Sequence, residues 1–227
     1  MPERALGGKA YNESIFFNCP FDAAYKPIFD ALVFAAFDCG YVPRCALETE
    51  DAGQVRIEKI LKLIRSCKLG VHDISRTELD RHNRLPRFNM PFELGVFIGA
   101  ARFGNQDQRH KVCLVLDREP YRFQKFISDI AGQDIRHHSD DPEVAIRQLR
   151  DWLANLPRKD VLPGGGAIAE RYTKFRKELP KILAKARILP KELIFADYTN
   201  IVSTWLSERP RPVKASRRVS WKRSLTP

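Results

Sequence analysis

The residues best suited to chemistry lie in the sequence RFNMPFELG at residues 87–95, which places one carboxylate, Glu93, at the start of an apolar helix. Asn89 can cap that helix, and Pro91 fits its first turn. The positive field of the helix start would then favour the ionised form of Glu93. Such a carboxylate beside apolar walls suits a nucleophile or a stabiliser of positive charge. The alternative is that Glu93 only satisfies free N–H groups of the first turn.

A second carboxylate, Asp73, lies at the end of an apolar run in the sequence HDISR at residues 72–76. An Asp at a strand end can hydrogen-bond sugar hydroxyls or orient a partner group, and the alternative is a cap for the following loop. His72 falls within the strand itself, which favours a core histidine over a catalytic base.

In an open parallel sheet, ligands bind beyond the carboxyl ends of the strands, and this rule selects further candidates. The substrate-binding candidates are Asn18, Pro20, Phe21, Asp22, Arg44, Ser75, Arg76, Asn89, Met90 and Asp117. Asp22 can instead cap the next helix. Arg44 and Arg76 can bind phosphate through forked hydrogen bonds or pair on the surface with Glu48 or Glu78.

The elements that must position these residues alternate between strand and helix along the chain. Apolar runs predict strands at 14–18, 41–47, 69–74, 111–116 and 134–137. Helical patterns cover 23–39, 54–68, the Glu93 segment, 120–131 and 142–156. This alternation predicts an α/β fold, a flavodoxin-like doubly wound parallel sheet of about five strands, with a helical C-terminal extension.

Glycine, proline and charge divide the chain further. We predict an N-terminal arm at 1–13, the α/β domain at 14–156, a linker at 157–166 and a helical extension at 167–208. Residues 209–227 are predicted to form a disordered basic tail, which carries seven Lys or Arg and no acid. Of the net charge of +11, the tail supplies +7 and the body only +4.

Composition and missing motifs limit the function classes. The five cysteines lack zinc-site spacing, so we expect no metal and reduced thiols. No apolar leader or membrane-length segment is present, which predicts a soluble, cytoplasmic protein. The sequence NCPFD at 18–22 replaces a glycine-rich phosphate loop, and no Gly-x-Ser-x-Gly motif occurs. These absences argue against dinucleotide-dependent hydride transfer, kinase chemistry and serine hydrolysis.

Four motifs together resemble a known group of proteins. IFFNCPFD at 15–22, HDISR at 72–76, NMPFELG at 89–95 and KVCLVL at 111–116 are similar to the nucleoside 2-deoxyribosyltransferase-like and TIR-like proteins of bacteria. The resemblance covers residues 14–138. The long charged loop at 75–88 and the bulky residues before Glu93 depart from the pattern and leave the substrate open.

The resemblance implies cleavage of an N-glycosidic bond, or ribosyl transfer, on a nucleoside, a nucleotide or NAD, with no separate cofactor. Glu93 would be the nucleophile or the stabiliser of the ribosyl cation, and Asp73 would bind sugar hydroxyls or assist proton transfer. Phe17, Phe21, Phe88 and Phe92 could supply apolar walls and a stacking surface for the base, and the alternative is that each is a plain core residue. Kinship also implies a homo-oligomer and a role as a stress or defence effector.

Two alternatives remain open. The same pocket could belong to a nucleotide-sensing or oligomerising module that binds its ligand without cleaving it. The basic tail at 209–227 could instead associate with nucleic acid, in a nonspecific and salt-sensitive way.

Overall fold

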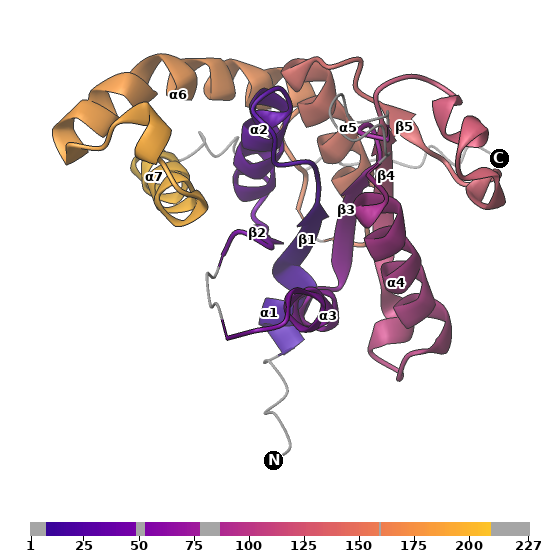
Figure 1. Cartoon of the computed structure of the whole chain (residues 1–227). Coiled ribbons are helices and arrows are strands. Elements are labelled where there is room, and N and C mark those ends of the chain that lie inside the picture. Colours follow the sequence, from indigo (N-terminus) through magenta and orange to yellow (C-terminus); the bar gives the residue numbers. More distant parts are fainter. Residues whose placement is uncertain (1–7, 49–52, 78–86, 159, 210–227) are drawn as a thin grey trace, which may run out of the picture.

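Five parallel strands form the central sheet of the computed structural model, which describes residues 8–48, 53–77, 87–158 and 160–209 (Figure 1). The strand order is β2-β1-β3-β4-β5, which confirms the predicted flavodoxin-like α/β fold. The strands are β1 (Ser14–Asn18), β2 (Val42–Cys45), β3 (Leu69–Asp73), β4 (Val112–Asp117) and β5 (Arg136–His137).

Helices cover both faces of this sheet. Helices α2 and α5 pack on one face, and α3 and α4 pack on the other (Figure 1). The helices are α1 (Gly8–Glu13), α2 (Lys26–Asp38), α3 (Arg56–Ser66), α4 (Asn89–Phe103), α5 (Pro142–Ala154), α6 (Gly165–Ala186) and α7 (Phe195–Glu208). Short 3-10 turns are η1 (Gln108–His110), η2 (Arg122–Lys125), η3 (Ser128–Ile130) and η4 (Pro190–Glu192).

The alternation of side chains along the strands decides which residues face which helices. Ile15 and Phe17 pack toward α2 and α5, whereas Phe16 packs toward α3 and α4. Asn18 therefore lies on the α3 and α4 face at the carboxyl end of β1. Asp73, two residues after a Val71 that packs with α2, lies on the opposite face.

The helical extension shares the main hydrophobic core. Helices α6 and α7 lie outside α2 (Figure 1). The ring of Phe34 on α2 contacts the rings of Phe175 and Trp205 at centroid distances of 5.3 and 5.9 Å. The Tyr198 hydroxyl donates to the Asp30 carbonyl of α2 at 2.9 Å. Burial on both sides of α2 therefore binds the extension to the sheet domain.

Several element boundaries differ from those predicted. Helix α2 begins at Lys26 instead of residue 23, because the Asp22 carboxylate accepts the Tyr25 N–H at 3.0 Å and forms a turn first. The expected helix at 120–131 is wrong. The backbone leaves helical angles at Ile127, so this segment forms the separate turns η2 and η3. Helix α1, in the expected N-terminal arm, was not predicted.

The end of the chain bears on the predicted tail. Arg209 follows α7 directly, and its guanidinium lies 2.9 Å from the Glu178 carboxylate and 4.8 Å from the centre of the Trp205 ring. Residues 210–227, the rest of the predicted tail, lie outside the described residues.

Two further properties concern the described part of the chain as a whole. None of its helices combines the length and apolar character that crossing a membrane requires. All five cysteines are free thiols, and four of them, Cys19, Cys39, Cys45 and Cys67, are buried.

Candidate functional site

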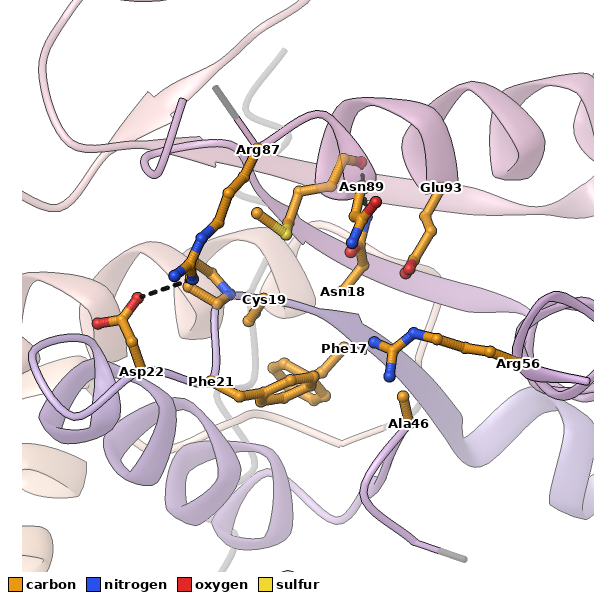
Figure 2. A pocket seen from close by; sticks show the side chains of 12 residues that line it. Phe17, Asn18, Cys19, Phe21, Asp22, Ala46, Arg56, Arg87, Asn89 and Glu93 are labelled. Carbon is orange, nitrogen blue, oxygen red and sulfur yellow. Dashed lines mark hydrogen bonds and ion pairs between the residues drawn. The ribbon is translucent and has the colours of Figure 1, made fainter. Parts of the chain in front are cut away.

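A cavity of about 360 Å³ opens at the carboxyl end of β1, between the starts of α3 and α4 (Figure 2). It is lined by Phe17, Asn18, Cys19, Pro20, Phe21, Asp22, Ala46, Arg56, Arg87, Asn89, Met90 and Glu93. After β1 the chain forms β2, which lies on one side of β1. It then crosses to the other side of β1, where β3 and β4 follow. The cavity therefore lies at the point where the strand order reverses, the usual ligand site of such sheets.

The structure brings together part of the predicted set. Seven candidates line the cavity, namely Asn18, Pro20, Phe21, Asp22, Asn89, Met90 and Glu93. Five others, Arg44, Asp73, Ser75, Arg76 and Asp117, are not among the lining residues.

Glu93 is placed differently from the expectation. The cap position of α4 is Phe88, Asn89 makes no capping hydrogen bond, and Glu93 is the fifth residue of the helix. The expectation that Asn89 caps a helix with Glu93 in its first turn is therefore wrong. The Glu93 side chain points into the cavity (Figure 2), is 8% exposed and makes no hydrogen bond to a described residue.

Burial governs the charge of Glu93. Loss of water raises the pKa of its carboxyl to about 7, and the Arg56 charge opposes this shift only in part. The expected preference for the ionised form is thus reversed, because Glu93 lies beyond the first turn and is desolvated. A carboxyl with this pKa exists in both forms near neutral pH and can accept or release a proton there.

Asn18 connects the end of β1 to the start of α4. Its amide nitrogen donates to the Met90 carbonyl at 2.8 Å and to the His72 Nδ1 at 3.0 Å. Both amide hydrogens are used in this way, which leaves the amide oxygen as an acceptor at the cavity wall. Burial, aided by the Lys111 charge, lowers the pKa of His72 to about 3, so His72 is a neutral core residue.

Asp73 lies behind the cavity, toward α2. Its carboxylate accepts the Tyr25 hydroxyl at 2.7 Å and the Ser75 N–H at 2.9 Å. The His138 Nε2 lies 3.0 Å from the same carboxylate. The bond to Ser75 is the loop-capping role that the sequence left open, and Asp73 has no exposed surface from which to touch a ligand.

Two arginine candidates pair with carboxylates. The Arg44 Nε donates to both Glu48 oxygens at 2.7 and 2.8 Å, which is the pairing that the sequence offered as the alternative to phosphate binding. Arg76 lies 3.7 Å from Asp22, just outside the cavity. Arg87 approaches the same Asp22 at 3.9 Å (Figure 2).

Asp117 is also held by a neighbour. The Arg122 guanidinium donates to Asp117 at 2.6 Å and to the Ile74 carbonyl at 2.8 Å, so it fills the space above the ends of β3 and β4. The Ser75 hydroxyl is buried beside this region, without a hydrogen bond to a described residue. The carboxyl ends of these two strands are therefore closed by protein groups.

The sequence interpretation missed Arg56, Arg87 and Ala46 as lining residues, and it considered Cys19 only as part of the NCPFD segment at 18–22. Arg56 belongs to a basic helix face at 54–68 that suggests plain solvation. Its position as the first residue of α3, close behind β2, is the signal that could have found it, because helices in this fold begin at the carboxyl edge.

Comparisons of the chain with protein-family models, with curated proteins and with solved structures found no match. What the cavity can do is therefore argued from its own geometry.

Proposed function

We propose that the cavity binds a nucleoside-like ligand and that Glu93 acts on the sugar carbon of its N-glycosidic bond, in hydrolysis or transfer to an acceptor. One observation carries this proposal. Glu93 is a carboxyl nine-tenths buried, without a hydrogen bond to a described residue, that reaches into a cavity beside apolar walls. The sequence resemblance independently implies the same chemistry for this residue.

The other lining groups suit such a ligand. A volume of about 360 Å³ is within the range of small-molecule sites. The rings of Phe17 and Phe21 offer an apolar surface for a base. The Asn18 amide oxygen and the Asn89 side chain can hydrogen-bond sugar hydroxyls.

In the proposed reaction, the ionised form of Glu93 approaches the anomeric carbon as the bond from that carbon to the base nitrogen breaks. The bonding electrons leave with the base, which takes a proton from water, and the carboxylate bonds to the sugar or balances its positive charge. Water or an acceptor hydroxyl then attacks the same carbon, loses a proton and releases the Glu93 carboxylate. Asp73 does not contact the ligand in this reaction, and its role is to hold Tyr25, Ser75 and His138 in position.

A sensing module is the second candidate. It is favoured by the burial of Asp73 behind the cavity, because glycosidases use a pair of carboxyl groups. Among the described lining residues, the other carboxyl beside Glu93 is Asp22, which lies near Arg76 and Arg87. Such a module would bind its ligand and leave the bond intact.

Chromatography of free base distinguishes the two. Purified protein is incubated with NAD, nucleosides and nucleotides, alongside Glu93→Gln and the control Glu143→Gln, which makes the same change at an exposed side chain of α5. We expect base release by the wild type and the control, and a loss of at least 100-fold in Glu93→Gln. Ligand binding without release by the wild type would favour the sensing module.

A further inference from the structure

Arg56 differs from the other arginines near the cavity in having its donors available. Its guanidinium extends from the start of α3 into the cavity, toward the space that Glu93 enters from α4 (Figure 2). It makes no hydrogen bond or ion pair to a described residue. In contrast, Arg44 is bound by Glu48, and Arg87 lies beside Asp22.

The start of α3 adds to this site. Val55 occupies the cap position, and its side chain makes no capping hydrogen bond. Arg56 is the next residue, so the first turn of this 11-residue helix lies at the edge of the cavity. The N–H groups of a helix start and its dipole favour an anion.

The charge of the cavity is compatible with an anion. Two arginines, Arg56 and Arg87, line it together with two carboxyls, Asp22 and Glu93. Because burial raises the pKa of Glu93 to about 7, that carboxyl is only partly ionised at neutral pH. The lining therefore carries no net negative charge that would repel a phosphate group.

We propose that Arg56, with the first turn of α3, binds a phosphate group of the ligand, so that the cavity selects phosphorylated nucleosides over free nucleosides. A guanidinium offers paired donors that match two phosphate oxygens. The class of ligand rests on the proposed function, whereas the choice of the phosphorylated form rests on Arg56.

Titration calorimetry tests the selection directly. The probes are the four ribonucleoside 5′-monophosphates and the four matching nucleosides, each titrated into wild type, Arg56→Ala and the control Lys62→Ala. Lys62 is exposed on the same helix and is not among the lining residues, so its loss removes one charge without changing the cavity. For the preferred base, we expect wild type and control to bind the monophosphate about 10- to 100-fold more tightly than the nucleoside.

In Arg56→Ala the monophosphate should bind at most about threefold more tightly than the nucleoside, and the affinity for the nucleoside should not change. Arg56→Lys should restore part of the preference for the monophosphate. Equal affinity of the wild type for both forms, or a ratio retained in Arg56→Ala, would overturn the role of Arg56. So would the absence of binding of any monophosphate at millimolar concentration.

Base release is measured separately so that the two proposals can fail separately. Binding selectivity that persists in Glu93→Gln, with no base release by the wild type, would reject the cleavage reaction and leave Arg56 as a phosphate-binding residue. Base release from nucleosides and monophosphates at equal efficiency would support Glu93 and reject Arg56.

Discussion

Burial of the Glu93 carboxyl makes the stability of the folded protein depend on pH. In an unfolded chain this carboxyl ionises at its ordinary pKa of 4.5, whereas burial raises that pKa to about 7 in the folded protein. Between these values the unfolded chain releases its proton first. The free energy of unfolding should therefore fall as pH rises from 4.5 to 7 and then stay level.

Replacing Glu93 by Gln removes this dependence. At pH 8 we expect Glu93→Gln to raise the free energy of unfolding by about 2 kcal/mol, and at pH 4 to leave it nearly unchanged. Urea unfolding followed by circular dichroism at both pH values measures the difference. An equal effect at pH 4 and pH 8 would mean that the carboxyl is not desolvated in the folded state.

At the scale of elements, the close approach of α4 to β3 depends on Gly70. A Cβ added to Gly70 would lie 2.7 Å from the His72 Nε2 and 2.8 Å from the Phe97 ring. We expect Gly70→Ala to lower the free energy of unfolding by about 1–3 kcal/mol, because both rings are fully enclosed.

The matched control for this change is Gly99→Ala, within α4, where an added Cβ would meet nothing within 4 Å. This substitution should raise stability by about 0.5–1 kcal/mol, since alanine is the better helix residue. Chemical denaturation measures both variants. Equal effects of the two substitutions would argue against tight packing between β3 and α4.

Most strands and helices could be predicted from the sequence, but the face of the sheet on which each side chain lies could not. Apolar runs identify β1, β3 and β4 because a parallel strand is buried on both sides. The same uniform burial hides the alternation, so the sequence did not show that Asn18 faces the cavity while Asp73 faces α2. Nor could it show that Arg122 covers Asp117, because that contact joins a turn to a strand end.

At the scale of the whole molecule, the helical extension and the sheet domain should unfold together. Trp205 on α7 is 3% exposed, and its ring contacts both Phe34 of α2 and Phe175 of α6. We expect Trp205→Ala to lower the free energy of unfolding by about 3–5 kcal/mol. The transition should remain single, because one core spans both parts.

Far-ultraviolet and near-ultraviolet circular dichroism, recorded through the same urea titration, test this cooperativity. Val161→Ala is the control, because Val161 is 91% exposed and its truncation should change stability by less than about 0.5 kcal/mol. Two separated transitions in the wild type would show that the extension is an independent folding unit.

The reactivity of the buried thiols reports local opening of the folded structure. Burial raises the pKa of Cys45 to about 12 and that of Cys67 to about 11, so almost no thiolate forms at neutral pH. The thiolate is the form that alkylating reagents attack. Each of these side chains becomes reactive only when its surroundings come apart. Cys19 also forms part of the cavity wall, so the rate at which an alkylating reagent modifies it would report how often that wall opens. A bound ligand would slow this modification.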